Sequence, residues 1–149
     1  MPASEQIVCP TCNALNRVPA DRPAGGANCG ACHGKLFDAV PIQVNEANFE
    51  RHLRSDSIPL LLDIWAPWCG PCRTMGPQFE RAAAILEPGV RLLKLNADEA
   101  PNVSARLGVR GIPALFLFRD GKPIAQTAGA MSADAIVRWT RENLSPPTH

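Results

Sequence analysis

Apolar residues in the second part of the chain follow two different periods, which predicts alternating strands and helices. The run PLLLDIWA (59–66) is apolar almost without alternation, and this is typical of a central strand covered on both faces. The run VRLLKLNA (90–97) predicts a second strand. Between them, apolar residues recur at i, i+4, i+7, i+8 and i+11. This spacing predicts a long helix that begins near Cys69 and has one apolar face, formed by Met75, Phe79, Ala82, Ala83 and Leu86.

The remaining elements follow from caps and turn residues. A short strand near 41–44 is followed by a helix with Asn45 as its N-cap, and residues 101–109 predict a short helix or turn. Residues 112–129 predict two strands joined by an Asp-Gly dipeptide, which favours a tight hairpin. The last helix starts at the N-cap Ser132. The predicted order is β-α-β-α-β-α-β-β-α, an α/β fold with parallel pairing first and an antiparallel hairpin last.

The first part of the chain has a different character. Residues 1–40 are rich in Cys, Pro, Gly, Ala and Asn, and they contain few large apolar side chains. Such a segment cannot bury enough surface to fold unaided. We therefore expect two domains, a small one at residues 1–40 and a larger one at residues 41–149.

Composition narrows the class of protein. The chain has 149 residues, of which 46% are hydrophobic and 19% charged, as in ordinary globular proteins. The first forty residues carry three basic and three acidic side chains, so they lack the basic stripe of a nucleic-acid module. No signal-peptide pattern is visible, and the apolar runs are too short to span a bilayer. We expect a soluble cytoplasmic protein without nucleic-acid or membrane partners.

The pair Cys69 and Cys72 in WAPWCGPC has the spacing of a redox centre. At the start of a helix these residues lie one turn apart, with Cβ atoms about 5 to 6 Å apart, and disulfides need Cα separations of roughly 4.4 to 6.8 Å. Pro71 suits the first helical turn because its missing N–H would have no partner there. Free N–H groups and the helix dipole favour a thiolate at Cys69, which lowers its pKa. We expect Cys69 to be the nucleophile and Cys72 the resolving thiol.

Asp63 stands in a strand where every neighbour is apolar, so we expect burial to raise the pKa of its carboxyl. A buried acid beneath a dithiol can exchange a proton with the resolving thiol near neutral pH. The alternative is a strand-end residue or a cap for a buried amide. Lys94, on the neighbouring predicted strand, is either the partner of Asp63 or a solvated strand-edge lysine.

Two further C-x2-C pairs in the first forty residues are separated by sixteen residues, which is a strong signature of a structural zinc site. The expected ligands are Cys9, Cys12, Cys29 and Cys32. Metal binding also supplies folding energy to a segment with a poor core. The alternative is two further disulfides, which a reducing compartment disfavours. His33 is expected to be a surface residue, and His52 and His149 have no evident partner.

In residues 41–145, the motifs LLLD, WAPWCGPC, KLNAD, GVRGIP, FRDGK and GAMS occur in an order that resembles the thioredoxin family. The resemblance implies a thioredoxin fold, with a central mixed β-sheet flanked by helices, and a cis peptide bond at Pro113 facing the active-site disulfide. It also implies a shallow substrate groove formed by Trp68, Gly70, Pro71, Gly111, Ile112, Pro113, Gly129 and Ala130. One departure is Ala114, where relatives often carry threonine.

The same resemblance implies a function. It is that of a thiol-disulfide oxidoreductase that reduces client proteins, such as reductases and peroxidases, and is itself re-reduced by thioredoxin reductase. It implies a monomer without a bound organic cofactor. A zinc ribbon before this domain resembles the thioredoxin 2 branch, and its Zn²⁺ is either structural or redox-regulatory.

Two rival functions remain open at this point. In the first, the protein is a zinc-ribbon interaction or scaffold module whose thioredoxin domain does not reduce clients, although a scaffold would not require both Cys69 and Cys72. In the second, it is an oxidase or isomerase of a disulfide-forming pathway. That class needs an export signal, and we would expect a histidine between the two cysteines, where this chain has Gly70 and Pro71.

Overall fold

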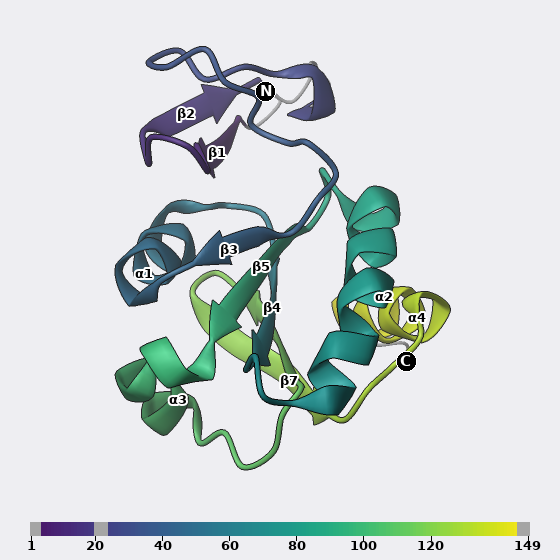
Figure 1. The fold of residues 1–149 in the computed structure, drawn as a ribbon. Coiled ribbons are helices and arrows are strands. Elements are labelled where there is room, and N and C mark those ends of the chain that lie inside the picture. Colours follow the sequence, from purple (N-terminus) through teal and green to yellow (C-terminus); the bar gives the residue numbers. More distant parts are fainter. Residues whose placement is uncertain (1–3, 20–23, 146–149) are drawn as a thin grey trace.

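The computed structural model of the chain describes residues 4–19 and 24–145, so His149 lies outside the described residues. These residues form two sheets (Figure 1). The strands are β1 (Glu5–Val8), β2 (Leu15–Val18), β3 (Ile42–Val44), β4 (Leu60–Trp65), β5 (Arg91–Asn96), β6 (Ala114–Arg119) and β7 (Lys122–Ala128). The helices are α1 (Glu46–Ser55), α2 (Gly70–Leu86), α3 (Pro101–Leu107) and α4 (Ala133–Leu144), with short 3-10 turns η1 (Ala24–Gly26) and η2 (Ala97–Glu99).

The larger sheet has the strand order β3-β5-β4-β6-β7. β5 lies between β3 and β4 and runs parallel to both, whereas β6 is antiparallel to β4 and to β7. This mixed sheet and the element order confirm the fold class predicted from the sequence. The N-caps also lie where the sequence places them, because Asn45 accepts the N–H of Asn48 and Ser132 accepts that of Ala135.

The sheet is covered on both faces, with α1 and α3 on one side and α2 and α4 on the other (Figure 1). Side chains of β4 alternate between the two layers, as the pleat requires. Leu60, Leu62 and Ile64 pack in the cluster that contains α1 and α3, whereas Leu61 packs against α2 and α4. Asp63 is two residues after Leu61 in the same strand, so its side chain lies on the same face of the sheet, which α2 covers.

The small β1-β2 sheet belongs to the cysteine-rich segment and packs against the larger domain. In Figure 1 it lies at the end of the large sheet opposite the beginning of α2. Ile58, which precedes β4, belongs to the same apolar cluster as Ile7, Leu36 and Phe37 of the small domain. The small domain thus completes its own core with a residue from the larger one.

One expectation about a histidine was wrong. His52 is 1% exposed, and its Nδ1 lies 2.5 Å from Oδ2 of Asp56, four residues further along at the end of α1. No partner was evident from the sequence because Asp56 lies just past the helix, where a polar residue is usually solvated. The structure shows instead that this end of α1 is covered by the small domain.

No helix in the described part of the chain is both long and apolar enough to cross a membrane.

Candidate active site and metal-binding site

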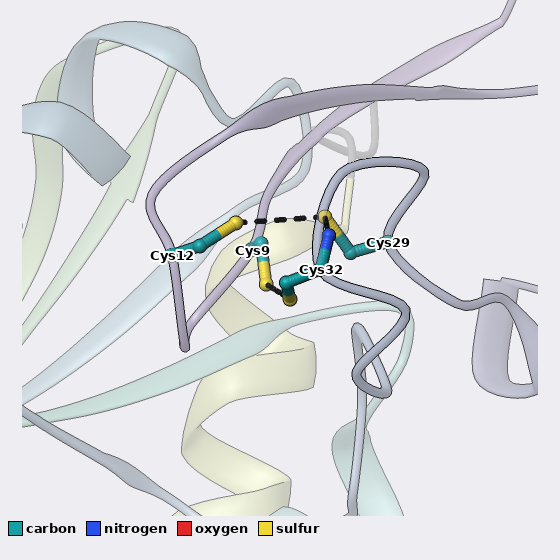
Figure 2. A group of neighbouring side chains, drawn as sticks. All are labelled: Cys9, Cys12, Cys29 and Cys32. Atoms are coloured by element: carbon teal, nitrogen blue, oxygen red, sulfur yellow. Dashed lines mark hydrogen bonds between the residues drawn. The ribbon is translucent and has the colours of Figure 1, made fainter.

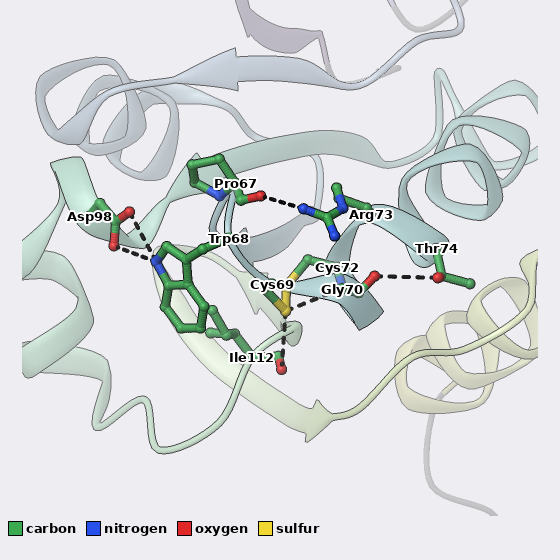
Figure 3. Close-up of a disulfide and its surroundings, with 9 residues drawn as sticks. All are labelled: Pro67, Trp68, Cys69, Gly70, Cys72, Arg73, Thr74, Asp98 and Ile112. Atoms are coloured by element: carbon green, nitrogen blue, oxygen red, sulfur yellow. Dashed lines mark hydrogen bonds between the residues drawn. A yellow bond between two sulfur atoms is a disulfide. The ribbon is translucent and has the colours of Figure 1, made fainter.

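Cys69 and Cys72 form a disulfide at the beginning of α2, with their Cα atoms 5.3 Å apart (Figure 3). Cys69 is the N-cap of this helix, and its backbone N–H donates to the carbonyl of Ala66 in the turn after β4. Gly70 and Pro71 then enter the first helical turn, where proline is tolerated. The cysteine pair thus follows the C-terminal end of the central strand β4, and α2 sets the separation of the two residues.

The beginning of α2 is suited to holding a negative charge on Cys69. The Sγ of Cys69 accepts the backbone N–H of Cys72 at 3.2 Å, and the first turn contains no acidic residue. Unpaired N–H groups and the positive end of the helix dipole stabilise an anion at this position. Amide donors of this kind stabilise thiolates in reduced cysteine pairs.

Asp63 is 1% exposed, and neither of its carboxylate oxygens has a hydrogen-bond partner among the described residues. Burial raises the pKa of this carboxyl to about 7, and the positive charge of Lys94 opposes part of that rise. Lys94 is the register neighbour of Asp63 on β5, but no ion pair joins the two in the described structure. The Nζ of Lys94 lies 5.0 Å from the centre of the Trp65 ring. Among the described residues the two side chains thus form no direct ion pair, and Lys94 affects Asp63 through the electrostatic lowering of its pKa.

The loop before β6 comes close to the disulfide. The carbonyl oxygen of Ile112 lies 3.8 Å from the Sγ of Cys69, and the Ile112–Pro113 peptide bond is cis. Gly129 donates its N–H to the carbonyl of Pro113 at 2.8 Å, which links the end of β7 to this loop. Gly129 has a φ of 102°, which a residue with a side chain rarely adopts.

Trp68 is 67% exposed beside Cys69, so it does not serve as core packing. Its Nε1 donates to both carboxylate oxygens of Asp98, at 3.1 and 3.2 Å (Figure 3). Sequence reasoning missed Asp98, although it lies within the KLNAD motif. Gly70 is partly exposed, and Pro71, Gly111 and Ala130 are exposed. These exposed residues surround the disulfide, whose two cysteines are themselves only 5% and 4% exposed.

The four cysteines of the small domain lie together (Figure 2). Their Sγ atoms all lie within 4.8 Å of one another, and the Cys9–Cys32 and Cys12–Cys29 pairs are each 3.6 Å apart. Tetrahedral zinc with Zn–S bonds of about 2.3 Å places its sulfurs about 3.8 Å apart. The cluster therefore has the size of a tetrathiolate metal site, and His33 is exposed and not part of it.

Backbone amides also point at these sulfurs. Cys9 accepts the N–H of Thr11 at 3.4 Å, and Cys29 accepts the N–H of Ala31 at 3.3 Å and the side-chain amide of Asn16 at 3.4 Å. Hydrogen bonds from the N–H of Cys32 and then from Asn16 lower the pKa of the Cys29 thiol, whereas the pKa of the neighbouring Cys12 thiol is raised. Such donors favour thiolates, which are the form that binds metal. The residues fit a zinc ion.

Comparison with known proteins agrees with this geometry. The thioredoxin family model matches residues 40–142, and the model of the thioredoxin 2 N-terminal zinc ribbon matches residues 8–34. The chain belongs to the thioredoxin family. It is a disulfide-reducing oxidoreductase with Cys69 and Cys72 as its C-x-x-C pair, preceded by a zinc-ribbon domain.

Three relatives show how far the similarity extends. Thioredoxin C-3 of Corynebacterium nephridii is 38% identical over 138 residues, which cover 93% of this chain and 94% of that protein. Thioredoxin 1 of Synechococcus elongatus is 40% identical over 71% of this chain and 99% of its own length. Thioredoxin of Rhodospirillum rubrum is 38% identical over 68% of this chain and 98% of its own length. The alignment with thioredoxin C-3 is long enough to extend from the thioredoxin domain into the zinc ribbon.

Proposed function

We propose that this protein reduces disulfides in other proteins, with Cys69 as the nucleophile and Cys72 as the resolving thiol. The observation that carries the proposal is the position of Cys69, which caps α2, accepts the N–H of Cys72 and lies beside an exposed surface. The Cys69 thiolate attacks one sulfur of the client disulfide, and the other client sulfur leaves as a thiolate that takes up a proton. Cys72 then attacks the Cys69 sulfur and releases the second client thiol. The client gains two electrons and two protons, and the protein ends in the disulfide form.

In the second step, we assign Asp63 as the group that accepts the proton of Cys72. A carboxyl with a pKa near 7 can hold or release a proton at neutral pH, which is what this transfer requires. The positive charge of Lys94 favours the ionised form of Asp63 and so lowers the pKa of this carboxyl. The alternative, that Asp63 caps a buried amide, has no support among the described hydrogen bonds because both carboxylate oxygens lack a partner.

Client proteins are proposed to dock on the surface around the disulfide. Trp68, fixed by Asp98, lies on one side of Cys69, and the Ile112–Pro113 loop lies against its sulfur. The proposed contact residues are Trp68, Gly70, Pro71, Gly111, Ile112, Pro113, Gly129 and Ala130. Most of them are exposed or partly exposed, so a client chain can reach the Cys69 side of the site.

Several wider features belong to the same proposal. We take residues 1–40 as the ribbon domain and 41–149 as the thioredoxin domain, which the two family matches support. Thioredoxin reductase is the proposed electron donor, and the clients are oxidised proteins such as reductases and peroxidases. We propose a monomer in the cytoplasm, where a reducing environment keeps the four ribbon cysteines as thiolates.

The four ribbon cysteines are proposed to hold one structural Zn²⁺. When bound, the ion cross-links the two cysteine pairs and stabilises the ribbon fold. A second candidate role is redox regulation, and it is favoured by the exposure of Cys12 and Cys32. The two roles are separated by measuring zinc release and the insulin-reduction rate before and after peroxide treatment. An unchanged rate after full zinc loss removes the regulatory role.

The proposed activity is tested by an insulin-turbidity assay coupled to NADPH and thioredoxin reductase. We expect rapid turbidity with consumption of NADPH, and neither with Cys69→Ser, which retains the fold but lacks the nucleophile. A natural chain that binds disulfide proteins without reducing insulin contradicts the proposal and supports the scaffold alternative.

A further inference from the structure

The two cysteine pairs of the ribbon differ in how they are attached to the thioredoxin domain. We call residues 9–14 the first knuckle and residues 29–34 the second knuckle. The chain enters the first knuckle through Val8, whose N–H donates to Oδ1 of Asp56 at 2.7 Å and whose carbonyl accepts from Nη2 of Arg91 at 3.2 Å. Both partners are buried, and the second oxygen of Asp56 is held by His52. Two thioredoxin-domain side chains thus fix the residue immediately before Cys9.

The other end of the first knuckle is held by α1. Asn13 has a φ of 65°, and its carbonyl accepts from Nε of Arg51 at 3.2 Å. Its side-chain amide donates to Oδ1 of Asn48 at 3.3 Å. The turn that carries Cys12 is therefore bound to a helix of the thioredoxin domain, and the first knuckle is attached at both ends.

The second knuckle has no comparable attachment. Gly30 donates to the side chain of Asn16 at 2.9 Å, and Cys29 donates to the carbonyl of Gly34 at 2.7 Å, so both bonds stay inside the ribbon. Among the described residues, no hydrogen bond joins positions 27–35 to the thioredoxin domain. After this segment the chain contacts that domain through Leu36, which shares an apolar cluster with Ile58, and through Phe37, whose ring lies 4.1 Å from the guanidinium carbon of Arg91.

We propose that Asn48, Arg51, Asp56 and Arg91 are positioning residues for the metal site, and that metal loss opens the second knuckle while the first stays in place. This inference rests on the proposed zinc site. The physical reason is that local opening follows the weakest attachments. Hydrogen bonds to the thioredoxin domain persist without zinc, whereas the second knuckle is held by the ion, by short bonds within the ribbon and by the packing of Cys29 in the apolar cluster. Two of the four proposed ligands, Cys9 and Cys12, therefore stay in position to bind zinc again.

Hydrogen–deuterium exchange of the full chain, read by mass spectrometry with and without zinc under reducing conditions, tests the proposal. We expect peptides covering residues 27–36 to exchange at least about tenfold faster once zinc is chelated, and residues 8–14 to change by less than about threefold. Equal changes in the two segments, whether both open or both stay protected, would overturn it. Metal analysis comes first, because a purified chain without zinc contradicts the zinc site itself rather than the unequal attachment.

A double substitution in α1 tests two of the four positioning residues directly. Asn48→Ala/Arg51→Ala removes both bonds to Asn13, so exchange at residues 11–14 should rise about fivefold or more in the zinc-free chain. The zinc-bound chain should change little, because the ion then holds the knuckle. The matched control is Arg54→Ala, because Arg54 is an exposed residue of the same helix and has no described bond to the ribbon. If the double variant exchanges like Arg54→Ala, the positioning role is wrong.

Discussion

Asp63 shows how one residue links stability to chemistry. Its carboxyl is buried beneath α2 without a hydrogen-bond partner in the described structure, and burial is the main cause of its raised pKa. A charged group in such a place destabilises the folded state whenever it is ionised. Ionised Asp63 therefore destabilises the fold at neutral pH and above, and the same raised pKa supports its proposed role as the proton acceptor for Cys72.

We predict that Asp63→Asn stabilises the oxidised chain more at high pH than at low pH. The carboxyl titrates near 3.8 when unfolded and near 7 when folded. Between these values the folded state binds more protons, so the stability of the natural chain falls as pH rises. The gain from the substitution should be small near pH 4 and reach at most about 4 kcal/mol above pH 7. Guanidinium unfolding of both chains at about pH 4.5 and about pH 8.5 measures this gain in the free energy of unfolding. An equal gain at the two pH values contradicts the assigned pKa.

The sequence indicated some of these residues and not others. Asp63 was singled out because a single acid interrupts an apolar strand, and the cysteine pairs of both domains were singled out by their spacing. Asp98 was missed because its role depends on the indole of Trp68, thirty positions away in the chain. The role of Lys94 was left open because the strand register places it next to Asp63, whereas the direction of its side chain depends on packing against Trp65.

At the scale of elements, local signals placed the helices and strands well. Asn45 and Ser132 cap their helices as predicted, and Cys69 caps α2. The end of α1 was less predictable, since Asp56 there accepts a hydrogen bond from a residue far away in the sequence. It caps the helix, holds His52 and accepts the N–H of Val8, forty-eight positions earlier. No local pattern encodes such a contact.

We predict that Asp56→Ala lowers the free energy of unfolding by about 2 to 4 kcal/mol, because it leaves the buried N–H of Val8 and the ring of His52 without an acceptor. Asp56→Asn keeps one acceptor oxygen and should cost clearly less. Guanidinium unfolding of both variants with zinc bound makes the comparison. If both variants lose the same stability, the hydrogen bond to Val8 is not the reason.

At the scale of the whole molecule, the two sites lie at opposite ends of the large sheet (Figure 1). The ribbon docks where β4 and β5 begin, whereas Cys69 follows the end of β4. The sequence predicted both domains from their composition and cysteine spacing. It did not predict the docking, because the interface depends on Ile58 and Arg91 from the larger domain, which read as ordinary strand-flanking residues.

This separation predicts the effect of removing zinc. Chelation under reducing conditions should leave the insulin-reduction rate within about twofold, since no ribbon residue is among the proposed client contacts. The fall in protection should be confined to the ribbon. The assay is run with the chelated chain and with the same chain reloaded with zinc. A tenfold loss of rate that zinc restores would show that the ribbon controls the active site.

The most direct test of the central claim is a trapping experiment on the cysteine pair. Cys72→Ser leaves Cys69 able to attack but removes the thiol that resolves the mixed disulfide. Incubated with an oxidised client protein, this variant should form a covalent adduct through Cys69 that a reductant releases, and Cys69→Ser should form far less. If Cys72→Ser forms no adduct, or if Cys69→Ser forms as much, Cys69 is not the nucleophile and the proposed mechanism is wrong.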